Sequence, residues 1–374
     1  MSGIRLDRYS RIVIKIGSSL LIDESGKTDT RWLESLAIDV ARLHAAGADV
    51  LIVSSGAIAI GSVSLGIDRR RARLGELQAA ASAGQMLLVN AWTAALARHG
   101  VVTAQVLLTP DDTENRRRFL NARSTFAELL KRRVVPVVNE NDTVATDEIR
   151  YGDNDRLAAR VAQLVMADVL VLLSDVDGLY DRDPRGSPDA RHIPEVTTIN
   201  ESIESIAGET RTATGSGGMA TKVEAARIAT RAGCSTIITL GTGEQPLAAL
   251  DAGGRSTLFR AAGTPAAQRK QWLAGILSVA GKVVIDSGAA AALARGSSLL
   301  PVGVVRVEGD FDRGDVVSIV VEAGQEIGRG LVEYSLADAA CLAGARSNEI
   351  EARLGYRGRT ALVHRDELVL FQHE

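Results

Sequence analysis

The stretch RIVIKIGSS, residues 11–19, combines a short apolar run with a lysine, a glycine and two serines. The run lacks polar alternation, which is typical of a strand buried on both faces of a sheet. Similar runs recur over the first two-thirds of the chain, separated by long amphipathic stretches that predict helices. We expect further strands at Asp49–Val53, Val101–Leu108, Val134–Val138, Val169–Leu173 and Thr236–Leu240, and helices at Thr30–Ala46, Leu77–Arg98, Asn115–Arg132, Asp155–Met166 and Thr221–Arg231. This alternation predicts an α/β sandwich of three layers, with helices on both faces of a mostly parallel central sheet.

Composition narrows the class of protein. The chain has 374 residues, enough for two domains, and a formal net charge of -3, which does not suit a protein that coats nucleic acid or an anionic membrane. Cys234 and Cys341 lie far apart and the five histidines are scattered, so no zinc or haem site is expected. Two lone cysteines, no signal-like N-terminus and no membrane-length apolar run favour a cytoplasmic protein without membrane contact.

The pattern changes near residue 260, where a connector-like stretch gives way to short, glycine-punctuated apolar segments. These segments are typical of a small β-rich domain. We expect a larger α/β domain over residues 1–260, a linker over 261–278, a β-rich domain over 279–360 and a C-terminal tail over 361–374.

Two glycine-rich turns each carry a lysine. In the first, Lys15 is followed by Gly17 and Ser18, so the backbone can approach phosphate oxygens while the lysine supplies charge. In the second, TGSGGMATK, residues 214–222, opens a predicted helix. The alternatives are a strand-end turn with a solvated lysine and a flexible linker. Neither G-x-x-x-x-G-K-[ST] nor G-x-G-x-x-G is present, so an ATP site here would use neither a P-loop nor a Rossmann fingerprint.

Polar and small residues follow three further strands, at the edge of the sheet where open parallel sheets bind ligands. SSGAIA, residues 54–59, offers backbone N–H donors for an anionic group. NEND, residues 139–142, and YGDND, residues 151–155, form the densest polar cluster, whose amides and carboxylates can read carboxylate and ammonium groups. Ser174 and Asp175 lie where a nucleotide could follow the sheet edge. Plain turns and solvated loops are the alternatives for each stretch.

These features favour phosphoryl transfer to a carboxylate. Two lysines beside glycine-rich turns would flank a transferring phosphoryl group, and the transfer would depend on alignment and charge neutralisation. A carboxylate with a pKa of about 4.3 is already an ionised nucleophile at neutral pH, so no catalytic base is needed.

The motifs, in this order, resemble those of the bacterial glutamate 5-kinase family, part of the amino acid kinase superfamily, whose members carry a C-terminal PUA domain. The matching stretches are IKIGSS (14–19), SSGAI (54–58), FLNAR (119–123), PVVNENDT (136–143), GDND (152–155), SDVDGLY (174–180), GSGGMATK (215–222), RGSSLLP (295–301) and LGY (354–356). The resemblance covers nearly the whole chain, and NEND and RGSSLLP are its most specific parts. It implies an amino acid kinase domain over 1–260 and a PUA domain over 279–360.

The resemblance implies roles for individual residues. The catalytic residues would be Lys15, Lys222, Asp153 and Asp155, with the aspartates organising the lysines or Mg²⁺. The glutamate-binding residues would be Ser55, Gly56, Asn139, Asn141, Asp142 and Asn154. The ATP-binding residues would be Lys15, Gly17, Ser18, Ser174, Asp175, Ser216, Gly217, Gly218, Met219, Ala220, Thr221 and Lys222. Ser216 stands where the family pattern has Thr, but the hydroxyl is kept. No residue is assigned as a metal ligand.

The resemblance also implies ATP and Mg²⁺ as cofactors and L-glutamate as substrate. The expected product is L-glutamyl 5-phosphate, in the first step of proline synthesis from glutamate. Further expectations are feedback inhibition by proline, a homo-oligomer (dimer or tetramer) and hand-over of the acyl phosphate to a reductase.

Three other functions are open at this point. A sibling kinase acting on acetylglutamate, aspartate, carbamate or UMP would share the fold. RNA binding by the PUA domain is a second, although residues 281–360 hold nine Lys/Arg against eleven Asp/Glu, a net of -2. A catalytically inactive amino acid sensor is a third, which the presence of both lysines disfavours.

Overall fold

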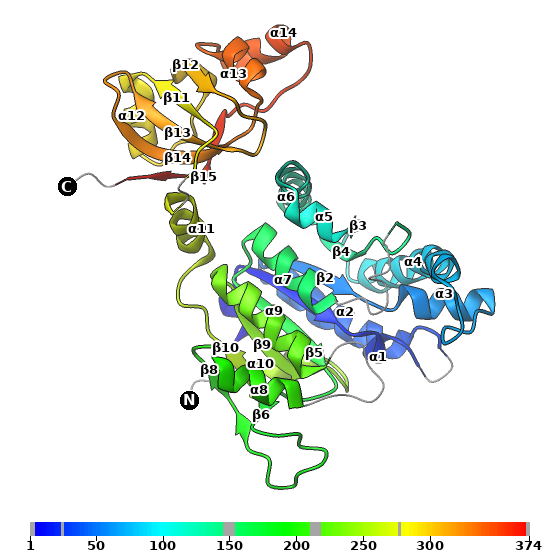
Figure 1. The fold of residues 1–374 in the computed structure, drawn as a ribbon. Helices are drawn as coiled ribbons and strands as arrows, with labels where there is room; N and C mark the ends of the chain where they lie inside the picture. The colour runs from blue at the N-terminus through cyan, green and yellow to red at the C-terminus, as the bar shows by residue number, and fades with distance from the viewer. Residues whose placement is uncertain (1–3, 24–25, 145–153, 210–217, 276–277, 372–374) are drawn as a thin grey trace. The chain divides into compact units, whose positions relative to one another are not determined.

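The structure is a computed structural model that describes residues 4–23, 26–144, 154–209, 218–275 and 278–371. The chain divides into two compact units. Unit 1 comprises Met1–Glu114 and Asn121–Pro265, and unit 2 comprises Asn115–Leu120 and Ala266–Glu374. Each unit has its own sheet and its own apolar core (Figure 1).

Unit 1 is built on an eight-stranded sheet in the order β3-β4-β2-β1-β5-β9-β10-β8. Its strands are β1 (Arg11–Ile16), β2 (Asp49–Ser54), β3 (Thr103–Leu108), β4 (Val135–Glu140), β5 (Val169–Ser174), β8 (Glu195–Val196), β9 (Ser235–Leu240) and β10 (Ser256–Phe259). Neighbouring strands run parallel except β9 and β10, which run antiparallel. The prediction of a mostly parallel α/β sheet is confirmed. A separate two-stranded hairpin, β6 (Leu179–Tyr180) and β7 (His192–Ile193), follows β5.

Helices cover both faces of this sheet. They are α1 (Ser18–Leu21), α2 (Thr30–Ala45), α3 (Ala57–Leu65), α4 (Leu74–Ala97), α5 (Pro110–Glu114), α6 (Arg116–Lys131), α7 (Asn154–Val165), α8 (Glu201–Glu209), α9 (Met219–Arg231) and α10 (Pro246–Asp251). Figure 1 shows α7 and α9 side by side over the sheet. The predicted helices agree with α2, α4, α6, α7 and α9 to within three residues at each end. The N-cap of α2 is Asp29, whose carboxylate accepts a hydrogen bond from the backbone N–H of Trp32 at 3.0 Å.

The alternation of side chains along β1 decides which face receives its lysine. Ile12, Ile14 and Ile16 are fully buried in an apolar cluster with side chains of α2 and α4. Because successive side chains of a strand point to opposite faces of the sheet, Lys15 lies on the face covered by α7 and α9. A lysine within an apolar run of the strand is thereby buried beneath two helices.

Helices α3 and α4 pack with their backbones in direct contact at two glycines. A Cβ atom added to Gly61 would lie 1.8 Å from the carbonyl oxygen of Ala80, and one added to Gly84 would lie 1.8 Å from that of Ala57. No side chain fits at either position. This close approach fixes α4 against α3, directly after β2.

Unit 2 contains a five-stranded sheet in the order β12-β11-β13-β14-β15. Its elements are α11 (Pro265–Ala274), β11 (Gly281–Ile285), α12 (Ser287–Ala294), β12 (Val304–Gly309), β13 (Val316–Val321), β14 (Glu326–Val332), α13 (Leu336–Leu342), α14 (Ile350–Leu354) and β15 (Val363–Leu370). The core of the sheet includes Val283, Ile319, Val332 and Leu342. This arrangement confirms the predicted small β-rich domain.

Two predicted boundaries of this region need correction. Residues 361–374 are not a tail throughout, because β15 pairs antiparallel with β14 and buries Val363 and Leu368. The stretch VHRDELVL lacks the regular apolar–polar alternation that predicts a strand, because four polar residues in a row follow Val363. Within the expected linker over 261–278, Pro265–Ala274 forms the helix α11.

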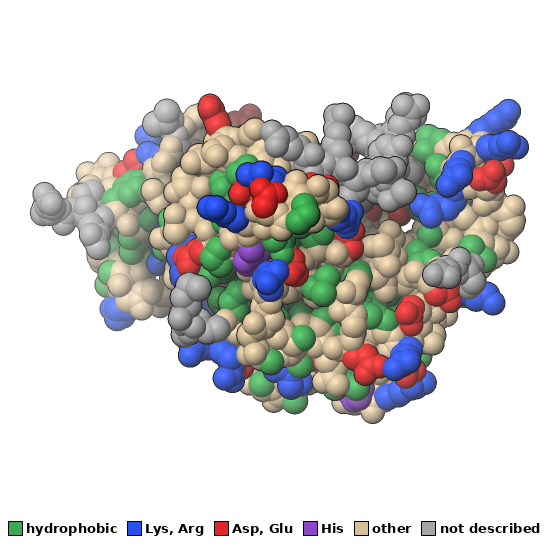
Figure 2. Space-filling model, turned by 90° about the horizontal axis from the view of Figure 1, so that it is seen from below, with side chains coloured by type: hydrophobic (Ala, Val, Ile, Leu, Met, Phe, Trp, Pro, Cys, Tyr) green, Lys and Arg blue, Asp and Glu red, His purple; other side chains and the backbone are tan. Residues whose placement is uncertain are grey.

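The surface carries both acidic and basic side chains, as expected from the nearly balanced composition. Figure 2 shows acidic and basic side chains interspersed over one face of the molecule, in keeping with a formal net charge of -3. Among the described residues, no helix is both long enough and apolar enough to cross a membrane.

The glycine contact between α3 and α4 gives a test of the fold. We expect Gly84→Ala to lower the free energy of unfolding by about 3 kcal/mol or more, because the added methyl overlaps backbone. The matched control is Gly75→Ala in the same helix, where a Cβ meets nothing within 4 Å. This change should raise stability by about 0.5–1 kcal/mol. Denaturant unfolding of both variants checks the prediction, and equal stability would contradict it.

Candidate active site

Three buried charged residues of unit 1 meet at one carboxylate. Asp155 Oδ1 lies 2.5 Å from Lys15 Nζ, and Asp155 Oδ2 lies 3.2 Å from Lys222 Nζ. The three residues are 1%, 7% and 6% exposed. Thr221 Oγ1 also donates to Asp155 Oδ2 at 2.9 Å. One carboxylate therefore holds two ammonium groups near the same point, at the end of β1 and the starts of α7 and α9.

The pKa of Asp155 reflects this arrangement. Burial alone would raise it, but the charges of Lys15 and Lys222, with hydrogen bonds from Lys15 and Thr221, outweigh burial and lower the pKa to about 2. Asp155 is thus ionised at all pH values where the protein would work. It orients the lysines and is not available as a proton donor.

A second cluster lies one residue away and is made of amides and hydroxyls. Asn154 Nδ2, with its two N–H bonds, lies within hydrogen-bond distance of three acceptors: Ser55 Oγ at 2.8 Å, Asn139 Oδ1 at 3.0 Å and the backbone carbonyl of Ser54 at 2.9 Å. Gly56, which follows Ser55, has φ of +104° and begins α3, a conformation that favours glycine. The cluster therefore gathers the ends of β2 and β4 and the first residue of α7.

The two clusters join at the first turn of α7. Asn154 and Asp155 are consecutive, yet the first contacts the ends of β2 and β4 and the second contacts the two lysines. The positive end of the helix dipole faces both clusters, which favours negatively charged groups there. A ligand bound at the amide cluster would thus lie beside the lysine pair.

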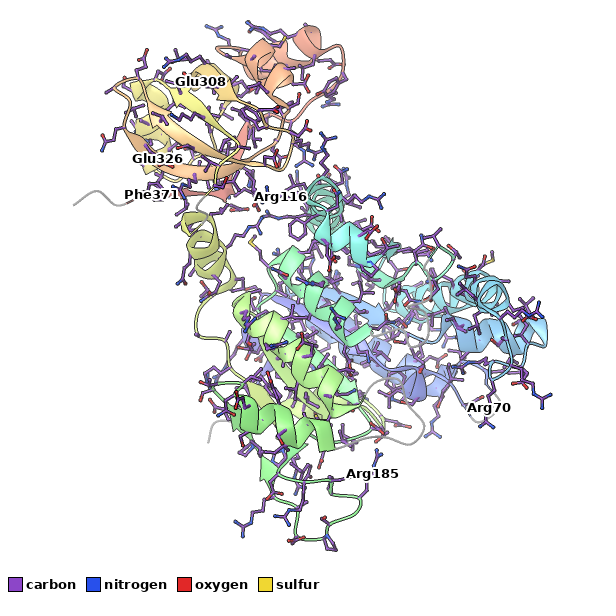
Figure 3. The ribbon with its side chains drawn as sticks, viewed as in Figure 1. Arg70, Arg116, Arg185, Glu308, Glu326 and Phe371 are labelled. Carbon is purple, nitrogen blue, oxygen red and sulfur yellow. The ribbon has the colours of Figure 1, made fainter. Side chains whose placement is uncertain are left out.

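A pocket lies against Lys222. It is lined by Ser174, Asp175, Val176, Gly178, Leu179, Tyr180, Arg182, Asp183, Pro184, Arg185, Gly218, Met219 and Lys222. Figure 3 labels Arg185, on the loop between β6 and β7, and its guanidinium donates to Asp175 at 2.6 Å. Ser174 Oγ donates to Asp175 as well, at 3.2 Å. The pocket runs from the carboxyl end of β5 to the start of α9, which suits a nucleotide whose phosphates reach Lys222.

Another pocket lies against α4. Asp142, 8% exposed, lines it together with Gln85, Glu140 and Asn141. Burial, followed by the charge of Glu140, raises the pKa of Asp142 to about 7. A buried carboxylate of this kind gains from a cationic ligand, since a nearby positive charge would restore its ionised form.

The structure brings most of the predicted site residues into these groups. Lys15, Asp155, Thr221 and Lys222 form the charged cluster, and Ser55, Asn139 and Asn154 form the amide cluster. Ser174, Asp175, Gly218 and Met219 line the pocket at Lys222, whereas Asn141 and Asp142 line the pocket at α4. Gly17, Ser18 and Ala220 lie at the start of α1 and in the first turn of α9, outside the residues that line either pocket. Asp153, Ser216 and Gly217 fall outside the described residues.

Sequence reasoning missed several residues that line the pockets. Gln85 is buried in the middle of α4, and its only signal is a polar residue at a position where the helix needs an apolar one. Tyr180, Asp183 and Arg185 follow Ser174 in a stretch that resembles an ordinary turn and loop. The pocket appears only when the hairpin folds back beside α9.

The described residues do not form a metal-binding cage. They hold no group of three or more His, Cys, Asp or Glu side chains arranged for a metal, and both oxygens of Asp155 are engaged. Magnesium that enters such a site with a nucleotide is usually held by phosphate oxygens and water with one or two carboxylates. The expectation of Mg²⁺ therefore assigns no ligand to these residues.

Comparison with known families fits this geometry. The model of the amino acid kinase family matches residues 10–239, and the model of the PUA domain matches residues 281–354. The fold and the site thus define the class of protein: an amino acid kinase with a C-terminal PUA domain.

Curated relatives narrow the class further. Proteins named glutamate 5-kinase from Brucella abortus (strain S19), Brucella ovis and Brucella canis are each 52% identical to this chain over 366 residues, covering 98% of it and 97% of the relative. The chain therefore belongs to the glutamate 5-kinase family. A carbamate kinase from Giardia lamblia bound to AMP-PNP is a weaker match, with 19% identity and a TM-score of 0.49 over 68% of this chain and 98% of that one. The family assignment does not depend on it.

The raised pKa of Asp142 predicts a pH-dependent stability. The folded-state pKa, about 7, lies above the ordinary value of 3.8, because the buried carboxyl ionises less readily than it does in the unfolded chain. The wild-type protein therefore loses stability as the pH rises from the ordinary pKa to the folded-state pKa. We expect Asp142→Asn to become progressively more stable than the wild type from pH 5 to pH 7.5, by on the order of 1–3 kcal/mol, and then level off. Urea unfolding across this pH range measures it. A stability difference independent of pH would show that Asp142 is not an ionising buried group.

Proposed function

We propose that this protein transfers the γ-phosphate of ATP to the side-chain carboxylate of L-glutamate, giving L-glutamyl 5-phosphate and ADP. The observation that carries the proposal is the start of α7, where Asn154 contacts the amide cluster and Asp155 holds both lysines. An acceptor bound at the amide cluster and a nucleotide in the pocket at Lys222 would meet at the lysine pair.

The reaction needs alignment and charge neutralisation more than acid–base chemistry. An ionised side-chain carboxylate oxygen attacks the γ-phosphorus, an O–P bond forms, and the bond from that phosphorus to the bridging β,γ-oxygen breaks. ADP leaves with the electron pair, and no proton moves. Lys15 and Lys222 neutralise the negative charge on the transferring group, and Asp155 keeps both ammonium groups oriented toward it. Mg²⁺ bound with ATP would supply further neutralisation of the phosphate charge.

Recognition of the amino acid falls to the residues around the second cluster. We assign contacts with the oxygens of the substrate's side-chain carboxylate to Ser55, Gly56 and Asn154. A hydroxyl, a backbone N–H and the N-terminus of a helix lie together there. We assign the α-ammonium group to Asp142, whose buried carboxylate gains from a cation. Asn139 and Asn141 complete the cluster and the rim of the pocket.

The choice of glutamate over the substrates of sibling kinases rests on the relatives. The curated proteins that share 52% identity over 98% of this chain carry the name glutamate 5-kinase. We infer the same substrate here, and with it a place in the first step of proline synthesis.

Further features of the family complete the proposal. Proline would act as feedback inhibitor by placing its own ammonium group at Asp142, in competition with glutamate. The protein would work in the cytoplasm as a homo-oligomer, and its unstable acyl phosphate would pass to a reductase. The PUA domain would take no part in the chemistry.

The proposed reaction is tested by ADP release with Mg²⁺-ATP against glutamate, acetylglutamate, aspartate, carbamate and UMP. Hydroxylamine is included because it traps an acyl phosphate as the hydroxamate. We expect turnover with glutamate alone and accumulation of the glutamyl hydroxamate. Turnover with a sibling substrate instead would leave the kinase chemistry standing and remove glutamate. A folded, ATP-binding protein that phosphorylates none of them would contradict the proposal.

A further inference from the structure

Three amide side chains form a continuous hydrogen-bonded chain from the amide cluster into α4. Asn154 Nδ2 donates to Asn139 Oδ1 at 3.0 Å, and Asn139 Nδ2 donates to Gln85 Oε1 at 2.7 Å. All three residues are at least nine-tenths buried. The chain thus links the first residue of α7, the end of β4 and the middle of α4.

The direction of this chain is fixed by a backbone group. Asn154 Nδ2 also meets the carbonyl oxygen of Ser54 at 2.9 Å, and a carbonyl can only accept. The nitrogen of Asn154 must therefore face Ser54, which leaves the oxygen of Asn139 to accept from Asn154. The nitrogen of Asn139 then donates to the oxygen of Gln85. Each amide is oriented by its neighbour, so none can be rotated by half a turn without losing a hydrogen bond.

The chain ends in a hydrogen-bond donor without a partner. Gln85 Nε2 is buried and has no hydrogen-bond partner among the residues that the structure describes. A buried polar group left in this state is destabilising, and native structures keep few of them. The backbone at Gln85 is held in place, because the neighbouring Gly84 packs against the backbone of α3. An oriented donor of this kind is typical of a site that receives its partner from a ligand.

Gln85 shares its pocket with Asp142. Both residues line one hollow, and they carry complementary groups, an amide N–H donor whose nitrogen is buried and a carboxylate. The α-carbon of an amino acid bears an ammonium group and a carboxylate on the same atom, so one hollow must offer an acceptor and a donor close together. Asp142 and Gln85 supply this pair.

We infer that Gln85 is a specificity-determining residue that donates a hydrogen bond to the α-carboxylate of the amino acid substrate, beside the α-ammonium group at Asp142. The inference rests on the proposed function, since it concerns the same acceptor. Together the two residues distinguish an α-amino acid from carboxylates that lack either charged group.

Substrate analogues that lack one group each test this assignment. Glutarate lacks the α-ammonium group, and 4-aminobutyrate lacks the α-carboxylate. The experiment measures kcat/KM for glutamate and the inhibition constants of both analogues, in the wild type and in Gln85→Ala. We expect Gln85→Ala to lower kcat/KM for glutamate about ten- to one-hundred-fold and to weaken glutarate equally, as for a lost hydrogen bond to a charged group. The inhibition constant of 4-aminobutyrate should stay within about threefold.

A second variant separates direct contact from a structural role. Gln85→Glu keeps the size of the side chain and an oxygen that accepts from Asn139, but it replaces the donor with a negative charge. Glutamate and glutarate should weaken at least as much as in Gln85→Ala, while 4-aminobutyrate should not. Equal loss for all three compounds, or recovery of glutamate turnover in Gln85→Glu, would overturn the inference and make Gln85 a support for Asn139. Absence of glutamate turnover in the wild type would instead overturn the proposed function, and this assignment with it.

Discussion

The buried carboxylate of Asp155, held between two ammonium groups, is the interaction on which the rest of the structure depends. A charge almost fully removed from water is tolerated only when it is paired. Both oxygens of Asp155 are occupied, one by Lys15 and one by Lys222 and Thr221. This requirement brings together the end of the central strand and the starts of two helices that lie far apart in the sequence. The sheet order, with β1 between β2 and β5, places these ends at one edge.

Asn154 and Asp155 are consecutive in the sequence but contact different clusters. Asp155 contacts the lysines and Asn154 contacts the amides, so a single helix start would align the proposed acceptor site with the proposed phosphoryl site. The charged cluster provides the charge neutralisation that phosphoryl transfer needs in general. The amide chain and the Gln85–Asp142 pocket are where a particular amino acid would be distinguished. In the proposed function, catalysis and selectivity thus involve two neighbouring residues at the start of α7.

The parallel sheet and the position of Lys15 could be predicted from the sequence, because both depend on local patterns of apolar and polar residues. Buried parallel strands are apolar throughout, and Lys15 stands out within such a run. The strand β15 was missed because its sequence lacks the regular alternation of apolar and polar residues that predicts a strand. Gln85 could not be found in advance, because a polar residue within a long helix says nothing of its partner. The link from Gln85 to Asn139 spans 54 positions and exists only in the folded sheet.

The central claim is that the Asp155 carboxylate orients the two lysines for phosphoryl transfer. The most direct measurement is the single-turnover rate of transfer from ATP to glutamate in Asp155→Asn, at saturating concentrations of both, with folding checked by circular dichroism. The amide keeps the size of the side chain but cannot pair with two ammonium groups. The account predicts a rate lower by about 10²–10³-fold in a protein that still folds. A folded variant whose transfer rate stays within a few-fold of the wild type would contradict it.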